Sequence, residues 1–450
     1  MKSSRVLIRS TVVAALGGFL FGFDTAVISG TTDALREVFE LSSQSLGFTV
    51  ASALIGTILG AILFGKPADM LGRLRVLMIL AILYLVSAVG SALAWDWYSF
   101  LIFRFLGGLA VGGSSVVSPM YIAEIAPAKI RGRLVALTQF NIVLGILVAF
   151  FSNYVIATLD LGDADWRWMF GIEAFPALAF FIFLFGNPCS PRWLVAKGRL
   201  EEASKVLERL GTDAGDAQQE VNEIKTSLDL EHHSLMEPFF SRKYLKPILL
   251  AVLIAMFNQL SGINALMYYA PHIFKMAGAA ANSALLQTVA VGGTNLIFTM
   301  LALLVIDHFG RRKLMLIGSI GYILSLGFTA LMFYRYGTEF DSAGNLAVLI
   351  GLLVFIASHA LGQGAVIWVF ISEIFPNRVR ARGQALGSFT HWFMAAAISW
   401  TFPLFAEFSG GHTFAFYAAM MVLQLLWVIF IMPETKGVPL EEIQKKLGIE

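Results

Sequence analysis

The chain alternates between long apolar runs and shorter polar segments. Each apolar run has about 20 residues, which is the length a helix needs to cross the hydrocarbon core of a bilayer. Twelve such runs lie at about 8–30, 46–65, 75–94, 98–122, 133–158, 168–186, 247–271, 284–306, 314–334, 346–370, 384–407 and 413–432. The pattern predicts an all-α membrane protein with twelve transmembrane helices.

The amino-acid composition agrees with this prediction. Of the 450 residues, 57% are hydrophobic and 14% are charged, whereas soluble domains have about 45–50% apolar and about 25% charged residues. The first run follows Lys2, Arg5 and Arg9 as a signal peptide would. It lacks a small-residue cleavage pattern, so we expect it to remain in the protein as the first span.

Positive charges fall almost entirely on one side of the predicted helices. Arg104 lies within a span, and the opposite side carries only Arg36, Arg167, Lys275 and Arg335. The other Lys and Arg residues lie at the two termini and in the loops after even-numbered spans. By the positive-inside rule, both termini are predicted to be cytoplasmic.

The largest polar segment separates six spans from six. Within it, Ser190-Pro191 is a helix-start signal, and "RLEEASKVLERL" has helical spacing between Gly198 and Gly211, so we expect short amphipathic helices. The predicted parts are an N-terminal six-helix half (1–186), a cytoplasmic helical linker (187–246), a C-terminal six-helix half (247–432) and a cytoplasmic tail (433–450).

Two loop motifs occur once in each half. "GKPADMLGRLR" (65–75) and "VIDHFGRRK" (305–313) share D-x-x-G-R, and "YIAEIAPAKIRGR" (121–133) matches "FISEIFPNRVRARG" (370–383). Their recurrence at equivalent loops indicates two pseudo-symmetric halves. Secondary transporters use such repeats to build a binding site between the halves.

The charged residues of these loops are candidates for a cytoplasmic latch, a set of ion pairs between the halves that holds one conformation closed. The alternative is that the arginines only anchor the chain to lipid headgroups. We expect tight turns at Gly72 and Gly310, with Asp69 and Asp307 capping the helices that follow. The latch candidates are Asp69, Arg73, Glu124, Arg131, Asp307, Arg311, Glu373 and Arg380.

Further motifs occur in a fixed order: "RFLGGLAVGGSS", "SPRWL" (190–194), "QLSGINALMYYAP" (259–271) and "PETKG" (433–437). With them, the whole chain resembles the sugar porter family of the major facilitator superfamily, and in particular bacterial proton-coupled monosaccharide symporters related to the glucose and fructose facilitators. The resemblance implies an inner-membrane carrier that works by alternating access. Cys189 departs from the family, which has Glu at this place in P-E-S-P-R, and this puts one cytoplasmic ion pair in doubt.

The predicted spans contain neutral amides, which can both donate to and accept from sugar hydroxyls. The seventh span is the richest and is interrupted by Ser261-Gly262, as in the broken helices that line carrier cavities. By resemblance, Gln139, Gln259, Asn264 and Asn295 hydrogen-bond sugar and Trp368 packs against it. The alternative is hydrogen bonding between helices, worth about 0.6 kcal/mol on average in membranes. The predicted substrate-binding residues are Gln139, Asn258, Gln259, Asn264, Tyr268, Asn295, His359, Trp368 and His391.

Two positions bear on the choice of sugar. Ala360 stands where the family's glucose carriers tend to have Glu, and His391 stands where they have Asn or Gln. His359 beside Ala360, with His391 before Trp392, resembles the fructose-selective carriers, so fructose is the expected substrate. The alternative for either histidine is a structural hydrogen bond, and glucose, xylose or a polyol remain alternative cargoes.

Asp24 and Arg104 are the ionisable residues deepest in the first half, and Glu173 is expected nearer the periplasmic surface. An Asp24–Arg104 pair that forms in only one conformation would link proton binding to the transport cycle, since the two states would then bind the proton differently. The alternative is a static pair in a passive uniporter. Close helix approach around Asp24 is expected at Gly17, Gly18, Gly22 and Gly30.

Other function classes fit the sequence less well. A drug exporter would favour charged or broadly aromatic cavities, and a sugar receptor would usually carry a long cytoplasmic tail. We find no metal-ligand cluster, nucleotide loop or nucleophile–base set in the sequence, so no enzyme, metal or cofactor is expected. The expected partners are a monosaccharide, a proton and the lipid bilayer, with no nucleic acid, and the protein is expected to be a monomer.

Overall fold

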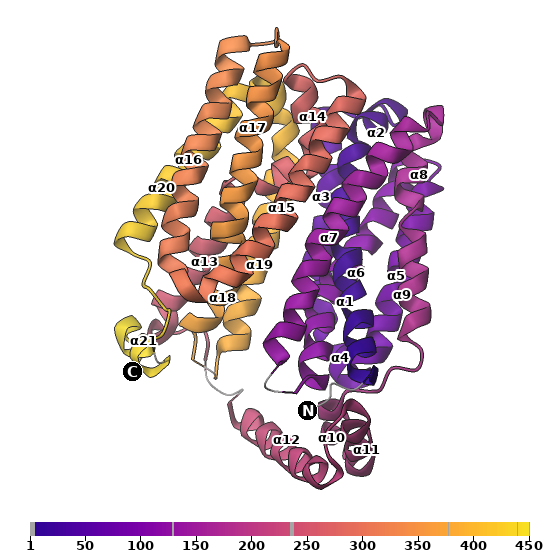
Figure 1. The fold of residues 1–450 in the computed structure, drawn as a ribbon, viewed down its shortest axis with the longest axis vertical. Helices are drawn as coiled ribbons and strands as arrows, with labels where there is room; N and C mark the ends of the chain where they lie inside the picture. Colours follow the sequence, from indigo (N-terminus) through magenta and orange to yellow (C-terminus); the bar gives the residue numbers. More distant parts are fainter. Residues whose placement is uncertain (1–4, 128–129, 235–237, 377, 439, 450) are drawn as a thin grey trace. The chain divides into compact units, whose positions relative to one another are not determined.

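The computed structural model describes residues 5–127, 130–234, 238–376, 378–438 and 440–449 (Figure 1). No strand occurs within these ranges. The helices are α1 (Arg5–Val27), α2 (Thr32–Val38), α3 (Ser43–Leu63), α4 (Gly65–Leu71), α5 (Arg73–Ala92), α6 (Trp97–Ile125), α7 (Arg131–Thr158), α8 (Asp165–Gly171), α9 (Ala174–Leu184), α10 (Pro191–Ala196), α11 (Leu200–Leu210), α12 (Ala214–Ser234), α13 (Leu245–Leu260), α14 (Ile263–Met276), α15 (Ala281–Phe309), α16 (Arg311–Tyr336), α17 (Ser342–His359), α18 (Ala365–Ile374), α19 (Arg380–Phe408), α20 (Gly410–Phe430) and α21 (Leu440–Leu447).

All twelve predicted spans coincide with helices. Within the described residues, eleven helical segments are long and apolar enough to cross a membrane. The predicted eleventh span, 384–407, is α19, which has 29 residues but is not one of these eleven. Polar residues in the middle of α19, such as Thr390, His391 and Ser399, lower its hydropathy.

The chain divides into two compact units. Unit 1 comprises Met1–Thr25, Ser52–Ala149 and Arg167–Met236, and unit 2 comprises Ala26–Ala51, Phe150–Trp166 and Glu237–Glu450. Two segments that precede the linker therefore belong to unit 2. One of them packs tightly there, because a Cβ atom on Gly47 would lie 2.0 Å from Trp400 O.

Glycines allow close helix packing in unit 1, as expected around Asp24. A Cβ atom on Gly22 of α1 would lie 1.9 Å from Ile142 O of α7, and one on Gly17 would lie 2.4 Å from Ser118 Oγ of α6. Contacts this close leave no room for a side chain. These glycines therefore set the packing of α1 on its neighbours.

The two D-x-x-G-R loops make the expected tight turns. Gly72 and Gly310 have φ of 93° and 86°, in the region that favours glycine. The prediction that Asp69 and Asp307 cap the next helices was wrong. Gly72 and Gly310 themselves occupy the N-cap positions of α5 and α16, without a side-chain cap, because each Asp lies three residues before the N-cap, within the preceding helix.

In unit 2, the seventh span is broken where expected. Gly262, between α13 and α14, has φ of 83°, and Ser261 Oγ donates to Asn258 O at 2.6 Å, so a carbonyl near the break is satisfied. A second irregularity was not predicted. A π-helical turn, η4 (Ala360–Gly364), joins α17 to α18, and such turns are frequent at functional sites.

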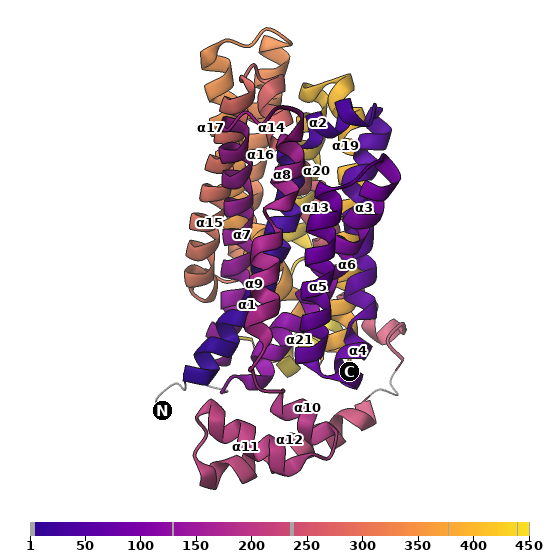
Figure 2. The same cartoon turned by 90° about the vertical axis from the view of Figure 1, so that its right-hand side faces the viewer.

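The polar linker forms short helices, as expected. Ser190 accepts a hydrogen bond from Trp193 N and caps α10, with Pro191 in the first turn, and Gly211 ends α11 in the left-handed conformation. Figures 1 and 2 show α10, α11 and α12 side by side. Their apolar faces share a small core that includes Trp193, Leu207 and Val221.

Candidate functional site

The amides of the broken seventh span form one hydrogen-bonded group in unit 2. Asn264 Nδ2 donates to Gln259 Oε1 at 2.9 Å, and Gln259 Nε2 donates to Asn258 Oδ1 at 2.9 Å. Asn258 and Gln259 are buried near the end of α13, and half-buried Asn264 begins α14. The helix break therefore brings the three amides together.

An aromatic ring adjoins these amides. Gln259 Nε2 lies 3.3 Å from each ring nitrogen of His391, and the ring centroids of His391 and Trp368 are 5.1 Å apart. Trp368 is 38% exposed, so it keeps a free surface. Amides for hydroxyls beside an aromatic surface for a ring are what a sugar site requires.

The other predicted substrate-binding residues are placed differently. His359 Nδ1 lies 2.6 Å from Tyr322 OH of α16, which is the arrangement of a structural hydrogen bond. Asn295 Oδ1 accepts from Thr299 one turn along α15 at 3.4 Å. Tyr268 is buried in α14, and Gln139 lies half-buried on α7 in unit 1.

Three buried residues that the sequence analysis did not single out extend the amide group. Asn258 Nδ2 donates to Gln363 Oε1, Gln363 Nε2 to Gln424 Oε1, and Gln424 Nε2 to Ser319 Oγ, at 3.2, 2.5 and 2.8 Å. The signal was available for the two glutamines. An amide in the middle of a span is costly without a partner, and Gln363 and Gln424 both occupy such positions.

The predicted Asp24–Arg104 pair is present in unit 1. Arg104 Nη1 lies 2.6 Å from Asp24 Oδ1, and Arg104 Nη2 donates to Asp24 O at 3.1 Å. Each side chain is 2% exposed. The guanidinium also lies 5.2 Å from the ring centroid of Phe170, so both ions are removed from solvent.

Glu173 is buried, with 1% exposure, at the junction of α8 and α9 in unit 1. It interacts electrostatically with both Asp24 and Arg104, and its Oε1 has no hydrogen-bond partner in the part of the chain that the structure describes. Two carboxylates and one guanidinium therefore lie within electrostatic range of one another.

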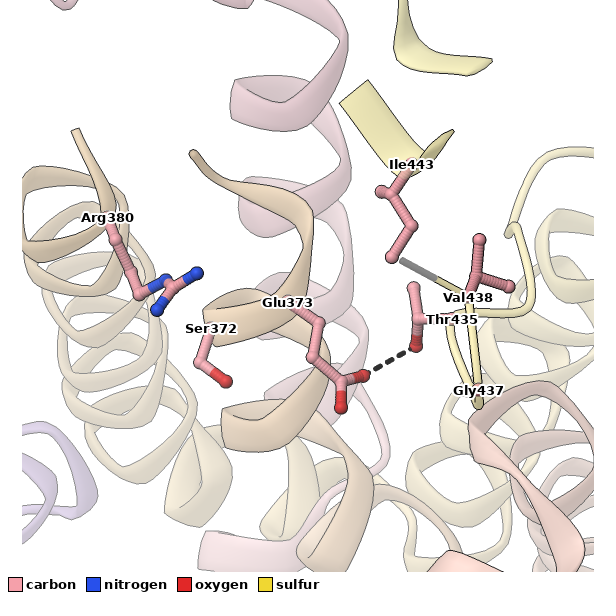
Figure 3. Close-up of a pocket in the computed structure, with 7 residues that line it drawn as sticks. All are labelled: Ser372, Glu373, Arg380, Thr435, Gly437, Val438 and Ile443. Atoms are coloured by element: carbon pink, nitrogen blue, oxygen red, sulfur yellow. Dashed lines mark hydrogen bonds between the residues drawn. The ribbon is translucent and has the colours of Figure 1, made fainter. Parts of the chain in front are cut away.

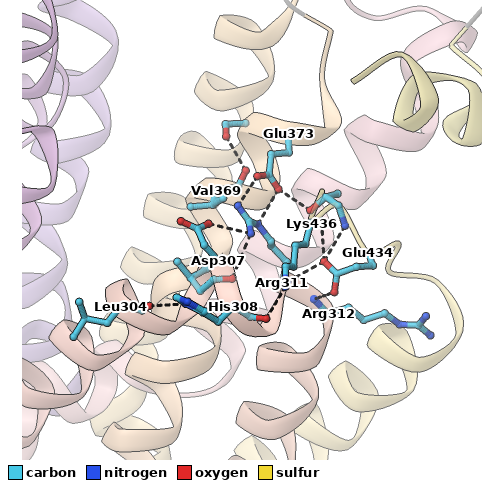
Figure 4. Close-up of polar contacts among 12 residues, drawn as sticks. Leu304, Asp307, His308, Arg311, Arg312, Val369, Glu373, Glu434 and Lys436 are labelled. Carbon is cyan, nitrogen blue, oxygen red and sulfur yellow. Dashed lines mark hydrogen bonds and ion pairs between the residues drawn. The ribbon is translucent and has the colours of Figure 1, made fainter. Parts of the chain in front are cut away.

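The C-terminal charge cluster joins Asp307, Arg311, Glu373 and the tail residue Glu434 (Figure 4). The tail residue Thr435 also belongs to it. Arg311 donates to Glu373 through Nη2 at 2.7 Å and Nε at 3.0 Å, and Thr435 Oγ1 donates to Glu373 at 2.6 Å. Asp307 lies 3.4 Å from Arg311. The cluster ties α15, α16, α18 and the tail together.

The N-terminal charge cluster, Asp69, Arg73, Glu124 and Ser190, repeats this arrangement in unit 1. Arg73 Nη2 lies 2.8 Å from Glu124 and 3.0 Å from Asp69, and Ser190 Oγ donates to Glu124. Both clusters therefore connect helices within one unit. All four members have an equivalent in the C-terminal charge cluster, which supports the predicted duplication.

Arg131 and Arg380 lie seven residues after Glu124 and Glu373 along the chain, but the structure gives both glutamates other partners. Arg131 donates to Ala126 O and Arg380 to Phe375 O, each at 3.4 Å. The ion-pair partner of each glutamate comes from a neighbouring helix, Arg73 of α5 for Glu124 and Arg311 of α16 for Glu373.

The two clusters differ at one position. Glu434 accepts from the backbone N–H groups of Arg311 and Arg312 at 3.0 and 3.1 Å, at the start of α16. Since Ser190 and Thr435 have equivalent roles, the residue equivalent to Glu434 is Cys189. The missing carboxylate noted in the sequence would therefore have served the N-terminus of α5, where an anion is favourable.

Comparisons with known proteins agree along the whole chain. The family model described as "Sugar (and other) transporter" matches residues 10–447. The chain is 40% identical to the D-xylose-proton symporter of Escherichia coli, covering 98% of this chain and 96% of that protein, and 38% identical to the arabinose-proton symporter of Bacillus subtilis, covering 96% and 93%. It matches the inward-open structure of the xylose transporter XylE from E. coli with a TM-score of 0.86, at 38% identity over 98% of this chain and 99% of that one.

The chain belongs to the sugar transporter family. Its twelve-helix architecture is that of the major facilitator superfamily, to which the matched xylose transporter belongs. Among the described residues of this transporter, no group of three or more His, Cys, Asp or Glu side chains is arranged to hold a metal ion.

Two ion-pair groups of the transporter were not predicted. In unit 2, Lys275 Nζ and His272 Nδ1 of α14 lie 2.5 and 3.4 Å from the carboxylate of Asp33 on α2. Nearby on α2, Arg36 pairs with Glu407 of α19. These contacts join the segment after the first span to the C-terminal helices.

A cavity of about 290 Å³ lies beside the C-terminal charge cluster of the transporter. Figure 3 shows the side chains of Ser372, Glu373 and Arg380 on one side and those of Thr435 and Ile443 on the other. It is the place where the tail and α21 meet α18.

Proposed function

We propose that the protein is a secondary active transporter that carries a monosaccharide across the inner membrane by alternating access, in symport with a proton. The observation that carries this proposal is the buried Asp24–Arg104 pair with Glu173 beside it. Family membership and the amide group near Trp368 support the sugar part. As a carrier it acts without catalytic residues or a cofactor.

The proton part follows from charge balance. Asp24, Glu173 and Arg104, when ionised, carry one more negative than positive charge, so the binding of one proton neutralises the group. Neutralisation is favourable inside a membrane protein, where an uncompensated charge is costly. A cycle in which Arg104 holds Asp24 in only one conformation makes proton binding and release depend on conformation. The alternative remains a static pair in a passive uniporter.

The substrate in this proposal is an aldose. The polar contacts to the sugar are Gln259, Asn264 and His391, and Trp368 packs on the sugar ring. Further contributions come from Asn258, Asn295, Tyr268 and Gln139. The names of the compared relatives indicate xylose and arabinose. They give no support to the fructose preference expected from His359 and His391, so fructose serves as the discriminating sugar of the test.

We further propose that both termini are cytoplasmic, that the transporter works as a monomer, and that its mobile parts are the two six-helix halves (1–186 and 247–432), with the linker (187–246) and tail (433–450) on the cytoplasmic side. The two charge clusters then lie on that side. There they hold the cytoplasmic ends of the helices of one half in one arrangement, whereas the latch expected from the sequence was a set of ion pairs between the halves.

The test is uptake of radiolabelled xylose, arabinose, galactose, glucose and fructose into proteoliposomes of the purified protein, with and without an imposed pH gradient, acidic outside. We expect aldose accumulation above equilibrium that requires the gradient and collapses with a protonophore. Uptake that ignores the gradient would establish a uniporter. Fructose as the preferred cargo would restore the sequence expectation, and an absence of sugar uptake would refute the proposal.

A further inference from the structure

A continuous line of polar side chains runs through unit 2 from the candidate sugar contacts to α16. Its members lie on α14, α13, η4, α20 and α16, so five elements meet along it. Gln259, Gln363, Gln424 and Ser319 each have 0% exposure and Asn258 has 2%. The line, in the direction of donation, is Asn264, Gln259, Asn258, Gln363, Gln424, Ser319 and the carbonyl of Met315.

The direction of this line is fixed at its α16 end. A backbone carbonyl can only accept, so Ser319 Oγ donates to Met315 O at 2.7 Å. The hydroxyl has one hydrogen, and it therefore accepts from Gln424 Nε2. The amide oxygen of Gln424 then faces Gln363 Nε2, and the same reasoning orients each amide up to Asn264.

Reversal of one amide in the line would be unfavourable. It would place two N–H groups or two carbonyl oxygens against each other in a site without solvent, and each buried group left without a partner costs free energy. The carbonyl of Met315 therefore fixes the orientation of each amide along the line, up to the candidate sugar contacts. The residues between need not contact the sugar themselves.

This orientation determines what the contacts offer to a ligand. Gln259 uses one N–H for Asn258 and points the amide nitrogen at His391. An amide nitrogen only donates, and it lies 3.3 Å from both ring nitrogens of His391, so the ring nitrogen that accepts from it is unprotonated. At the end of the line, Asn264 keeps its Oδ1 and its second N–H outside the line for a hydroxyl.

We propose that Gln363 and Gln424 are positioning residues for sugar specificity. They hold the amides of Gln259 and Asn264 in one orientation and so fix which groups donate and which accept at the sugar hydroxyls. The proposal rests on the proposed function, because it takes Gln259 and Asn264 as sugar contacts. It extends that function by assigning part of the selectivity to residues behind the contact layer.

The test compares two disrupting variants with a matched control. Gln424→Met keeps the length of the side chain but removes the acceptor for Gln363. Ser319→Ala removes the fixed end of the line. Ser325→Ala is the control: it is another buried serine of α16, its hydroxyl donates to the carbonyl four residues earlier at 2.7 Å, as that of Ser319 does, and it lies outside the line.

The readout is the ratio of kcat/KM for D-glucose and D-galactose, which differ at one hydroxyl, measured by uptake into proteoliposomes alongside thermal stability in detergent. We expect the preference of the wild type for one of the two sugars, measured by this ratio, to fall by about tenfold in Gln424→Met, which corresponds to ~1.4 kcal/mol. The preference should also fall in Ser319→Ala. Ser325→Ala should keep the wild-type ratio.

Two results would overturn the proposal. One is a Gln424→Met or Ser319→Ala protein that transports with the wild-type ratio. The other is an equal loss for both sugars, since that is the result of a merely structural role. If Gln424→Met does not fold, the smaller Ser319→Ala change decides. Neither result would contradict the proposed function, provided that the wild-type protein takes up sugar in response to a pH gradient.

Discussion

Arg104 Nη1 lies 2.6 Å from Asp24 Oδ1, and both side chains are almost fully buried within unit 1. A buried ion pair is a weak source of stability, because desolvation offsets most of the attraction. Its presence in a span therefore calls for another explanation. In the proposed symport Glu173 supplies one, since a second carboxylate would give the group a place for a proton.

Replacement of Asp24 by Asn is expected to separate transport from coupling. Arg104 keeps Glu173 as a countercharge, so the variant should fold, but its charged group no longer needs a proton to become neutral. We expect sugar counterflow in proteoliposomes to continue while accumulation driven by a pH gradient is lost. An Asn variant that still concentrates sugar would exclude Asp24 as the coupling site.

Replacement of Arg104 by Met is expected to act differently, although it breaks the same pair. It leaves two buried carboxylates without a cation, and the removal of one partner of a buried pair costs about 3–5 kcal/mol. Thermal unfolding in detergent should show a much larger loss for Arg104→Met than for Asp24→Asn. Equal losses would mean that Glu173 is no countercharge for Arg104.

The two charge clusters predict an order of stability losses. Arg73 and Glu124 are each 9% exposed, whereas Glu373, the partner of Arg311, is 27% exposed. Removal of Arg73 therefore leaves the more deeply buried carboxylate, that of Glu124, without its ion-pair partner, whereas removal of Arg311 does so for the less buried Glu373. We expect Arg73→Ala to lower the free energy of unfolding by about 3–5 kcal/mol and Arg311→Ala by less.

Asp69→Ala and Asp307→Ala are the controls for this comparison. Their carboxylates are 69% and 80% exposed, and exposed ion pairs contribute about 0–1 kcal/mol. Thermal shift measurements in one detergent would rank the four variants. A larger effect of Arg311→Ala than of Arg73→Ala would contradict the burial argument.

The location of the helices, and of the polar residues and the glycine that interrupt them, could be predicted from the sequence for a physical reason. A bilayer requires long apolar helices, so a single Asp24 or Asn264 within a span is conspicuous. Gly262 marked the helix break for a similar reason, since it adopts a backbone conformation that other residues avoid. These features depend on local chemistry alone.

Partner choice could not be predicted in this way. Glu124 is seven residues from Arg131 along the chain, but it pairs with Arg73 because α5 packs against α6. Gln363 and Gln424 lie in different spans, and no spacing rule connects them. Such pairs follow from how helices pack, which depends on many side chains at once.

The ion pair between Asp33 and Lys275 predicts a pH response of unit 2. Burial acts to raise the pKa of Asp33, but hydrogen bonds and charges from His272 and Lys275 outweigh it and hold that pKa well below its ordinary value of 3.8. The stabilisation is therefore complete above about pH 4 and is lost only as pH falls through the lowered pKa. Asp33 should stay ionised from pH 5 to 8.

A double-mutant cycle with Asp33→Asn and Lys275→Met measures this pair. Both side chains are partly exposed, so we expect a coupling energy of about 1 kcal/mol or less, reduced by high salt. The coupling should be the same at pH 6 and pH 8 in a His272→Gln background. A change between these pH values in that background would show that Asp33 itself titrates there.

Close packing at Gly22 predicts a strong effect of a single methyl group. A Cβ atom there would lie 1.9 Å from Ile142 O and 2.8 Å from its carbonyl carbon, which belong to the backbone of α7. A backbone cannot rotate away as a side chain can, so α1 must shift away from α7. We expect Gly22→Ala to lower the free energy of unfolding by about 1–3 kcal/mol.

Gly327→Ala is the matched control, because Gly327 is also in the middle of a long helix but has no neighbouring atom within 4 Å of an added Cβ. There alanine favours the helix, and we expect a gain of about 0.4–1 kcal/mol. The two variants should thus move the unfolding temperature in opposite directions. Because α1 carries Asp24, Gly22→Ala should also weaken proton-driven accumulation, and a variant with normal stability and accumulation would show that α1 and α7 do not need this contact.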